Sequence, residues 1–256
     1  MNRIEELFTR KKANILSIFY TAGFPNLTDT VSIAIELEKA GADMIEIGVP
    51  FSDPIADGPV IQDSNTIALA NGITVPLLLE QVKIIRQSVK LPIVLMGYLN
   101  PIMQFGVELF CQQASDAGVD GVILPDMPMI EFERTYAPLF LRYNLLNTFL
   151  ISPTTSEERI RKIDAATKGF IYAVSSSSTT GAKGEFAVEQ EEYFKKLQGL
   201  NLKNPFLIGF GISNQKTFVT ACRYAPGAIV GSAFISHLRQ HQTENIRSFI
   251  DSIKQS

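Results

Sequence analysis

The sequence contains eight short, continuously apolar runs separated by helix-compatible segments, so that one run recurs about every 30 residues. Their number and spacing limit the fold more than any other feature of the chain. The runs occupy residues 15–22, 44–49, 92–97, 121–124, 145–151, 170–174, 205–210 and 228–230. Strands without alternating polar residues belong to parallel sheets that are buried on both faces. The pattern therefore predicts an α/β fold with a parallel sheet.

Eight βα units in a chain of 256 residues favour a single (β/α)8 TIM barrel over a doubly wound sheet. We expect one domain over residues 1–256, with an extra N-terminal helix at about residues 3–12. Another helix begins near Thr28 or Asp29, either of which can cap it, and ends at Gly41.

Two connections are longer than the others, at residues 51–61 after the second strand and 175–187 after the sixth strand. In a barrel, both of these loops lie at the catalytic end of the strands. The second contains a serine run that is also typical of an ordinary flexible segment. Long loops at the catalytic end are often lids that close over a substrate.

Composition argues against several classes of protein. The formal net charge of −3 gives no electrostatic footprint for nucleic acid, and no run of Lys or Arg suggests binding to a membrane surface. The charged N-terminus lacks the apolar core of a signal peptide, and no apolar segment is long enough to cross a bilayer. Cys111 and Cys222 lie far apart without metal-ligand spacing, which is typical of structural thiols. We therefore predict a cytoplasmic protein.

One carboxylate, Glu46, lies inside the second apolar run. An unpaired ionised carboxylate in an apolar environment is costly, and such a group usually shifts its pKa and becomes neutral. Two interpretations stay open from the residue type alone. Glu46 forms a structural ion pair or reaches water at a strand end, or it transfers protons at the mouth of the barrel.

Alternation along the second strand places Met44, Glu46 and Gly48 on one face. If this face points into the barrel, Glu46 is half-desolvated near the mouth. Its pKa is then raised, which suits a group that both gives and takes a proton. Asp57, in the loop that follows, is expected to stay ionised and to accept a hydrogen bond. Two carboxylates whose pKa values are pushed apart form a recognisable acid/base pair.

Other polar side chains lie in or after the later strands. Tyr98 and Asn100 follow the third strand, Asp126 follows the fourth, and Tyr172 lies within the sixth. Asp126 either joins the site or caps the helix that follows it. These residues are the remaining candidates for proton transfer and for hydrogen bonding to a substrate.

The two histidines of the chain, His237 and His241, are four residues apart and share one face if the segment is helical. No carboxylate or cysteine joins them at matching spacing, so we interpret them as a solvated helix face and predict no metal site. Mechanisms that pair a histidine with Ser or Cys are disfavoured for the same reason. Lys183 lies in the serine-rich loop, and no strand carries a lysine suited to a Schiff base.

Glycine motifs follow the last two strands. Gly209-Phe210-Gly211 follows the seventh, and Gly231-Ser232 follows the eighth and opens a helix. Barrels frequently bind phosphate at these two loops through backbone N–H groups. Apolar side chains that suit a flat ring lie in or at the ends of strands, although packing in the barrel core explains each one alone: Phe19, Met96, Ile123, Ile151 and Phe210. A small phosphorylated substrate with a flat apolar group is predicted.

The sequence resembles the tryptophan synthase alpha chain family over nearly its whole length. The motifs that carry the resemblance are Phe19-Tyr20-Thr21-Ala22-Gly23-Phe24-Pro25, the stretch from Glu46 to Pro59 with Gln62, Tyr98-Leu99-Asn100-Pro101, Pro125-Asp126-Met127-Pro128, Gly209-Phe210-Gly211-Ile212 and Gly231-Ser232. The resemblance implies a (β/α)8 barrel that cleaves indole-3-glycerol phosphate to indole and glyceraldehyde 3-phosphate in a retro-aldol reaction.

The resemblance also implies roles for individual residues. It implies Glu46 as the general acid/base and Asp57 as the acceptor for the indole N–H. The other implied and predicted residues either contact the substrate or belong to loops that close over it. Tyr172, Phe19, Tyr98 and Phe210 line the pocket, Gly181, Gly211, Gly231 and Ser232 bind the phosphate, and Asp53 and Thr180 belong to the two loops that close.

The family works with a beta chain that carries pyridoxal phosphate and consumes the indole, which implies an αββα heterotetramer and an alpha chain with no cofactor of its own. The second-strand loop and Pro101-Ile102-Met103 are predicted to face this partner. One departure is the run of four serines at positions 175–178, where many members carry an arginine or a glycine. This departure concerns loop closure and leaves Glu46 and Asp57 unaffected.

Three other functions stay open at this stage. The chain can be a stand-alone lyase that releases free indole, a non-catalytic subunit that activates a beta chain, or a sugar-phosphate isomerase or epimerase. The presence of Glu46 and Asp57 disfavours the non-catalytic subunit. The lack of a histidine at a strand end and of a metal-ligand set disfavours the isomerase and the epimerase.

Overall fold

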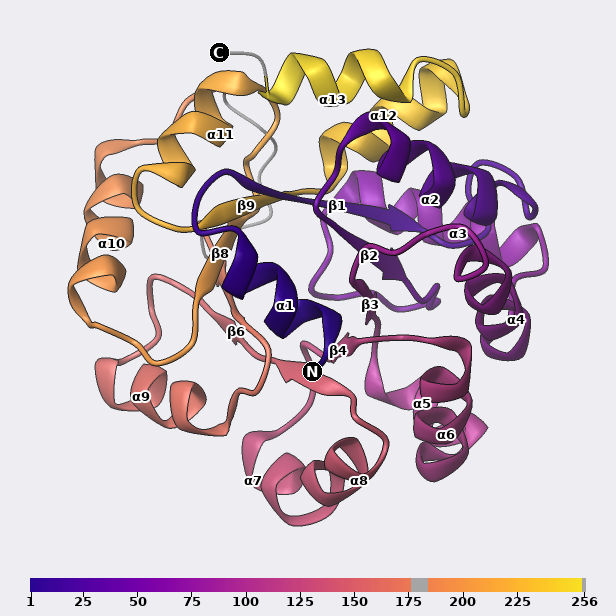
Figure 1. Ribbon diagram of the computed structural model, residues 1–256, viewed down its shortest axis with the longest axis horizontal. Coiled ribbons are helices and arrows are strands. Elements are labelled where there is room, and N and C mark those ends of the chain that lie inside the picture. Colours follow the sequence, from indigo (N-terminus) through magenta and orange to yellow (C-terminus); the bar gives the residue numbers. More distant parts are fainter. Residues whose placement is uncertain (176–183, 255–256) are drawn as a thin grey trace.

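A computed structural model describes residues 1–175 and 184–254 of the chain. All of its strands lie in one nine-stranded parallel sheet, in the order β5-β4-β3-β2-β1-β9-β8-β7-β6. The strands are β1 (Ile15–Thr21), β2 (Met44–Gly48), β3 (Ile93–Met96), β4 (Gly121–Ile123), β5 (Leu146–Thr148), β6 (Leu150–Ile151), β7 (Ile171–Val174), β8 (Phe206–Gly209) and β9 (Gly227–Val230). Figure 1 shows them at the centre of the molecule with helices around them.

The sheet closes into a barrel through β5 and β6, which are consecutive in the chain. β5 pairs with β4 on one side, whereas β6 pairs with β7 on the other. Between them, the carbonyl oxygen of Phe149 accepts a hydrogen bond of 2.9 Å from the N–H of Tyr172. The single strand expected at residues 145–151 is therefore divided at Phe149, because its two halves pair with different neighbours. The predicted (β/α)8 architecture is confirmed.

Helices follow the strands and form the outer layer of the barrel (Figure 1). They are α1 (Arg3–Arg10), α2 (Asp29–Ala40), α3 (Pro59–Ala70), α4 (Val75–Ile85), α5 (Leu99–Phe105), α6 (Val107–Ala117), α7 (Met129–Glu131), the π-helical turn η1 (Phe132–Tyr136), α8 (Ala137–Arg142), α9 (Glu157–Ala166), α10 (Val188–Gly199), α11 (Gln215–Cys222), α12 (Ser232–His241) and α13 (Ile246–Lys254). The long loop expected after the second strand lies before α3, which begins at Pro59, whereas residues 176–183 of the second long loop lie outside the described residues.

The first strand shows how alternate residues are divided between the two faces of the sheet. The hydroxyl of Tyr20 donates to the carbonyl oxygen of Thr30 in α2, so this side chain points outward to the helices. The hydroxyl of Ser17 donates to Glu46, so this side chain points into the barrel. The same alternation carries Phe19 inward, because it is two residues beyond Ser17. The pocket at the end of the strands is therefore lined by residues from the inward face.

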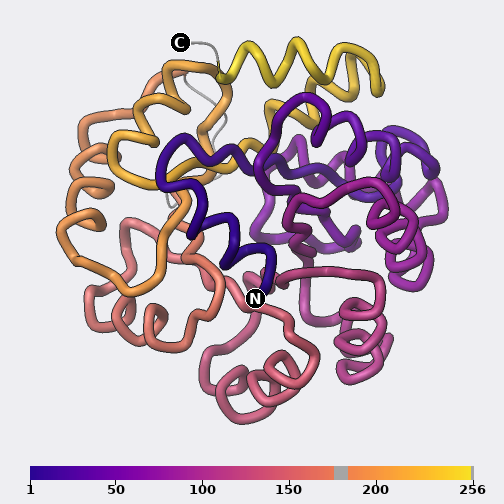
Figure 2. Tube along the Cα trace, in the orientation of Figure 1, coloured from indigo at the N-terminus to yellow at the C-terminus, as the bar shows by residue number. Residues whose placement is uncertain are grey.

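Helix α1 lies across the N-terminal end of the barrel, in front of the strands in Figure 1 and Figure 2. Asn2 caps it in a capping box with Glu5, and the same side chain donates to the carbonyl oxygens of Asp120 and Asn144. Ile4 and Leu7 are buried against the barrel. The extra N-terminal helix is thus confirmed, with its last residue at Arg10 rather than near residue 12.

The helix caps bear out one prediction and correct another. Gly41 ends α2 in the left-handed conformation, with φ of 92°, as expected for a glycine after the last turn. Thr28 occupies the position before the first turn, but its backbone is helical and its side chain makes no capping bond. The carboxylate of Asp29 instead accepts hydrogen bonds from the backbone and side chain of Asn26, and so it stabilises the preceding turn.

Both cysteines lie in helices far from each other and are free thiols, Cys111 in α6 and Cys222 at the end of α11. Burial raises the pKa of Cys111 to about 12 and that of Cys222 to about 11. Protonated, desolvated thiols are unreactive. This agrees with the prediction of structural thiols.

Within residues 1–175 and 184–254, no single helix is both long and apolar enough to cross a membrane. The pair α3 and α4, which meet at 98°, passes that test together on length and composition only. Both helices bury one face in this structure, through Ile61 and Ala68 in α3 and through Leu78 and Val82 in α4. That the whole chain is one domain stays a prediction.

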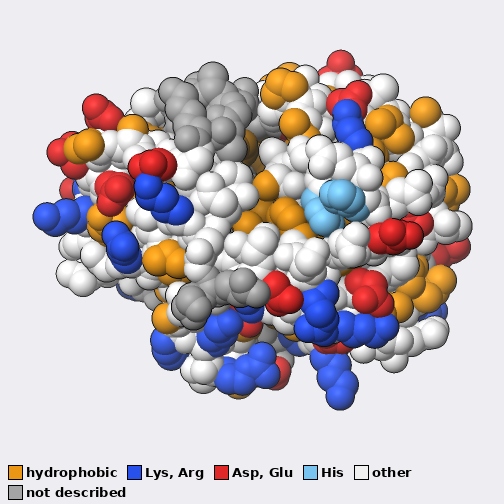
Figure 3. All heavy atoms as spheres, turned by 90° about the horizontal axis from the view of Figure 1, so that it is seen from above, with side chains coloured by type: hydrophobic (Ala, Val, Ile, Leu, Met, Phe, Trp, Pro, Cys, Tyr) orange, Lys and Arg blue, Asp and Glu red, His pale blue; other side chains and the backbone are white. Residues whose placement is uncertain are grey.

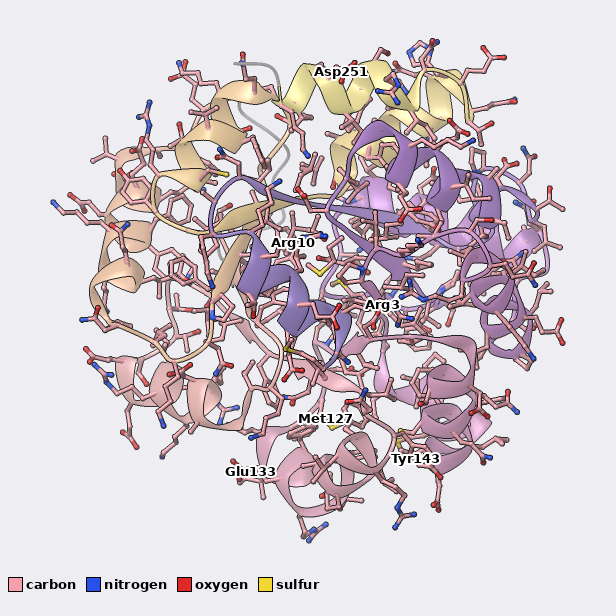
Figure 4. The ribbon with its side chains drawn as sticks, viewed as in Figure 1. Arg3, Arg10, Met127, Glu133, Tyr143 and Asp251 are labelled. Carbon is pink, nitrogen blue, oxygen red and sulfur yellow. The ribbon has the colours of Figure 1, made fainter. Side chains whose placement is uncertain are left out.

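A buried ion-pair network joins α1 to the start of β3 and β4. Asp120, whose side chain is 3% exposed, accepts from Arg3 at 2.9 Å and pairs with Arg86. It also accepts from the backbone N–H of Ile93 at 2.8 Å. Arg86 is itself largely buried and donates to the carbonyl oxygens of Gly118 and Leu91. Figure 4 labels Arg3, the first residue of α1, near the centre of the view.

Replacing Asp120 with Asn is expected to destabilise the fold, because it leaves the buried Arg86 guanidinium without its counter-charge. Removing one partner of a buried pair costs about 3–5 kcal/mol. Urea unfolding measures the loss. Glu157→Gln is the matched control, since the pair of Glu157 with Arg161 is exposed and is worth about 0.3–0.5 kcal/mol. Equal stabilities of the two variants would show that the Asp120 network does not hold the barrel end together.

Candidate active site

The candidate site lies at the C-terminal end of the strands, where a small pocket opens between β1, β2 and β3. Its lining combines inward strand residues with residues of the loops that follow. They are Phe19, Gly48, Val49, Asp57, Asn65, Met96, Gly97, Tyr98 and Pro125. The cavity volume is about 10 Å³, which is room for about one water molecule.

Glu46 lies below this pocket inside the barrel, between Phe19 of β1 and Val94 of β3 in the strand register. Its side chain is fully buried. Oε1 accepts a hydrogen bond of 2.8 Å from Oγ of Ser17, whereas Oε2 has no hydrogen-bond partner among the described residues. Burial raises the pKa of Glu46 from 4.5 to about 8, and the Ser17 bond opposes part of this rise.

Two expectations for Glu46 change as a result. The carboxyl group is completely desolvated rather than half-desolvated, and it lies below the mouth of the barrel. No Lys, Arg or His side chain among residues 1–175 and 184–254 pairs with Glu46, so a structural ion pair does not explain the residue there. The predicted shared face of Met44, Glu46 and Gly48 agrees with the structure, since Gly48 lines the pocket above Glu46.

Asp57 lies in the loop after β2, yet its side chain is only 7% exposed, because the loop folds back over the barrel. Oδ2 accepts a hydrogen bond of 3.0 Å from the hydroxyl of Tyr98. That hydroxyl in turn accepts from the N–H of Ala56 at 2.9 Å, which fixes its direction. Gln62 donates to the carbonyl oxygen of Asp57. Tyr98 thus holds the carboxylate of Asp57, and Gln62 holds its backbone.

The environment of Asp57 differs from the solvated loop that the sequence suggested. Burial raises its pKa to about 6, while the Tyr98 hydrogen bond lowers it. The group is still ionised at neutral pH, as expected. Two carboxyl groups with pKa values of about 8 and about 6 thus belong to one site, one mostly protonated and one mostly ionised at pH 7.

Tyr172 reaches the same region from β7 and is 5% exposed. Its ring lies against Gly209 so closely that a Cβ atom at that position would be 2.3 Å from the phenol oxygen. Burial raises the pKa of Tyr172 well above its usual range, and the charges of Glu46 and Asp57 raise it further. Tyr172 is therefore a neutral hydroxyl near both carboxyl groups. Phe210 packs edge-on against its ring, with centroids 6.1 Å apart.

The two glycine loops follow the C-terminal ends of β8 and β9. After β8, Phe210 and Gly211 both have positive φ, 62° and 72°. Phe210 is a bulky residue in a conformation that L side chains rarely adopt, and such positions cluster at functional sites. Gly231 precedes α12, and Ser232 is the first residue of that helix. A Cβ atom on Gly231 would lie 3.6 Å from the ring of Phe19, so this loop borders the pocket.

Some predicted residues lie elsewhere. Asp53 is exposed and its carboxylate accepts from the hydroxyl of Ser52, its neighbour. Asp126 does not cap the helix after it; its carboxylate accepts from the N–H of Leu99 at 3.0 Å and so caps the start of α5. The position before α7 is Pro128, whose ring offers no cap. Thr180, Gly181 and Lys183 lie outside the described residues.

The histidines form part of an aromatic cluster rather than a fully solvated face. The rings of His237 and His241 share one side of α12, with centroids 4.8 Å apart, and His237 also packs on Phe234 and Phe249. Burial lowers the pKa of His237. Figure 3 shows the histidines beside hydrophobic side chains. Among the described residues, no three His, Cys, Asp or Glu side chains are placed to hold a metal ion.

The sequence analysis missed two residues of the site. Ser17 is fully buried and bonds to Glu46, and Asn65 of α3 lines the pocket next to Asp57. A signal for Ser17 was present, since it is a polar residue on the same face as Phe19 within an apolar strand. Asn65 gave no such signal, because asparagine is ordinary on an amphipathic helix.

Comparison with known proteins gives a consistent match. The family model of the tryptophan synthase alpha chain matches residues 5–255. The chain is 52% identical to the tryptophan synthase alpha chain of Flavobacterium johnsoniae, over 99% of this chain and 100% of that protein. It is 53% identical to that of Flavobacterium psychrophilum, with the same coverage.

Solved structures agree with this match. The crystal structure of the tryptophan synthase alpha chain from Legionella pneumophila superposes with a TM-score of 0.87 at 35% identity, covering 99% of this chain and 96% of that one. The corresponding subunit from Pyrococcus furiosus gives a TM-score of 0.87 at 32% identity, covering 95% and 98%.

Burial of Glu46 predicts a pH-dependent gap in stability between the native chain and Glu46→Gln. Because the folded pKa of about 8 exceeds the ordinary value of 4.5, the native state binds the proton more tightly, and its stability falls as pH rises through that range. The variant removes this loss, which is worth about 1.4 kcal/mol per pKa unit. Its advantage should grow from pH 5 to pH 9 in urea unfolding.

Glu192→Gln is the matched control, since Glu192 is exposed on α10. Its stability relative to the native chain should stay constant over the same pH range. A constant gap for Glu46→Gln as well would contradict the desolvation of Glu46.

Proposed function

The chain belongs to the tryptophan synthase alpha chain family, and from this membership we propose that it cleaves indole-3-glycerol phosphate to indole and glyceraldehyde 3-phosphate. The observation that carries the proposal is the Glu46 carboxyl group, fully buried inside the barrel with one oxygen free of any partner among the described residues. A carboxyl group in this environment exchanges protons near neutral pH.

The reaction needs one proton given and one proton taken. Protonation of indole C3 prepares the bond between C3 and the glycerol chain for cleavage. The glycerol carbon bonded to C3 carries a hydroxyl group, and when this hydroxyl loses its proton and the bond breaks, that glycerol carbon becomes the aldehyde. We assign both transfers to Glu46, which donates as the acid and then accepts as the carboxylate. The proton balance closes within one residue, and no further reactant is required. A pKa of about 8 makes both forms accessible at neutral pH.

Asp57 is assigned to the charge that develops on the ring. When C3 is protonated, the indole nitrogen becomes positive, and an ionised carboxylate that accepts its N–H stabilises this charge. Asp57 is ionised at neutral pH, and Tyr98 holds it in one direction. This preorganisation matters because a carboxylate that is already fixed needs no reorganisation during the reaction.

The rest of the site is assigned by shape. Phe19, Met96, Tyr172 and Phe210 offer apolar surface for the ring, while Gly211, Gly231 and Ser232 offer backbone N–H groups for the phosphate. Gly181 is proposed for the same phosphate, and Asp53 and Thr180 for loop closure.

Substitution of the two carboxyl groups tests this proposal through the release of indole from indole-3-glycerol phosphate. Glu46→Gln should abolish cleavage, and Asp57→Asn should lose most of the rate, since general acid/base groups contribute about 10²–10⁴-fold. Both variants should still bind an uncleavable indole phosphate analogue, because neither carboxyl group contacts the phosphate. Near-normal turnover of Glu46→Gln would overturn the assignment. A change of Asp57→Asn that affects only binding would overturn its role in stabilising charge.

We also propose a partner: a beta chain that carries pyridoxal phosphate, in an αββα assembly in the cytoplasm, with no cofactor on this chain. Exposed apolar side chains support a docking surface at the catalytic end. They follow successive strands, Ile55 after β2, Met103 in α5 after β3, and Ile130 in α7 after β4, and are 84%, 54% and 78% exposed. The predicted Pro101-Ile102-Met103 segment forms the three central residues of α5, which has seven residues.

The partner is tested by adding a tryptophan synthase beta chain to the indole-release assay. Stimulation is expected, and Met103→Asp should weaken it about 10-fold or more, because a buried interface charge is costly. Ile84→Asp is the matched control, since Ile84 is 49% exposed at the far end of α4. Rapid indole release that the beta chain does not stimulate would favour the stand-alone lyase. A non-catalytic subunit would be favoured if a variant without the Glu46 and Asp57 carboxyl groups still stimulated the beta chain's own reaction.

A further inference from the structure

Ser17 makes the one hydrogen bond that the Glu46 side chain receives from the described residues. Both side chains are fully buried, and both strands that carry them are core strands of the barrel. Oγ of Ser17 lies 2.8 Å from Oε1, a normal distance for a hydroxyl that donates to a carboxylate. Oε2 of the same carboxyl group is left without a partner there.

We propose that Ser17 is a positioning residue for Glu46: its hydroxyl holds Oε1, so that Oε2 alone exchanges protons with the substrate. The inference rests on the proposed function, since it assigns the geometry of that reaction. It goes beyond it because Ser17 does not line the pocket and acts only through Glu46. A carboxyl group that rotates freely presents either oxygen, whereas a held group presents one.

The asymmetry of the two oxygens is the reason for this assignment. A buried carboxyl oxygen without a hydrogen-bond partner loses its hydration without compensation, which is unfavourable. Among the described residues, Oε2 has no such partner, whereas Oε1 accepts a hydrogen bond from Ser17 of the neighbouring strand β1. An arrangement that served stability alone would be expected to satisfy both oxygens. The free oxygen is therefore the atom available for proton transfer.

Other groups near Glu46 do not take over this role. Tyr172 of β7 and Asp57 of the loop after β2 are the titratable groups whose charges interact in this region. Burial keeps the Tyr172 hydroxyl neutral, with its pKa well above the usual range. Asp57 is bound to Tyr98. Changes in the proton equilibrium of Glu46 on substitution of Ser17 are thus attributable to Ser17 itself.

Ser17→Ala should alter the pH profile of kcat/KM for indole release. In the native chain we expect an acidic limb from Asp57 and an alkaline limb from Glu46. Loss of a hydrogen bond to the carboxylate should move the alkaline limb up by about one pH unit and leave the acidic limb in place. It should lower kcat about 10- to 100-fold with little change in KM, because misplacement of a reacting group acts on the chemical step.

Thr21→Val is the matched control, since Thr21 is another fully buried hydroxyl on the inward face of β1 and bonds to Ser64 instead of Glu46. This variant should leave the alkaline limb where it is. Ser17→Thr keeps the hydroxyl and should restore the native limb and most of kcat. If the added methyl group unfolds that variant, Ser17→Cys, a weak donor of native size, should fall between the native chain and Ser17→Ala.

An unmoved alkaline limb in Ser17→Ala, or an equal shift in Thr21→Val, would overturn the assignment. A loss of stability at all pH values without a shift would show a merely structural role. Urea unfolding between pH 5 and pH 9 gives a readout that needs no activity. The upper end of the pH range in which stability falls is set by the folded pKa of Glu46, so it should move upward in Ser17→Ala while the lower end stays in place. If the native chain releases no indole, the proposed function fails, while this unfolding result still decides whether Ser17 controls the proton on Glu46.

Discussion

A desolvated carboxyl group with one hydrogen bond is the constraint on which the site depends. Glu46 lies on β2 between β1 and β3, where its side chain is fully buried in the interior of the closed barrel. The free energy that holds it there comes from the packing of the apolar strands around it, because an isolated carboxylate is unfavourable in that environment. The buried carboxyl group lowers the stability of the fold and supplies a proton-transfer group whose pKa lies near neutrality, and such a loss of stability is common at active sites.

Closure of the barrel brings together groups that are distant in sequence. β1 contributes Ser17 and Phe19, the loop after β2 contributes Asp57, and β7 contributes Tyr172, which lies over Gly209. Each group is held by a neighbour: Asp57 by Tyr98, and Glu46 by Ser17. The opposite end of the barrel is closed by α1 and the Asp120 network, so the chemistry and the structural ion pairs occupy separate ends.

The strands and the inward position of Glu46 were predictable, because hydrophobic runs and period-two alternation are local properties of the sequence. Contacts between segments that are distant in the sequence were not predictable. The break at Phe149 depends on which neighbour each half of the strand pairs with. The burial of Asp57 depends on a loop folding back onto Tyr98, and Asp126 caps a helix that precedes it in the chain rather than the next one. These contacts join segments that no local pattern connects.

The titration of the Glu46 carboxyl group is the measurement that tests this account most directly. Carbon-13 NMR of chain labelled at the glutamate carboxyl carbon follows it, with the Glu46 signal assigned by its absence in Glu46→Gln. The account predicts a midpoint near pH 8, several units above that of the exposed glutamates as a class. A midpoint near 4.5 would mean that the carboxyl group is solvated, and it would remove the physical basis for Glu46 as the acid and base of the reaction.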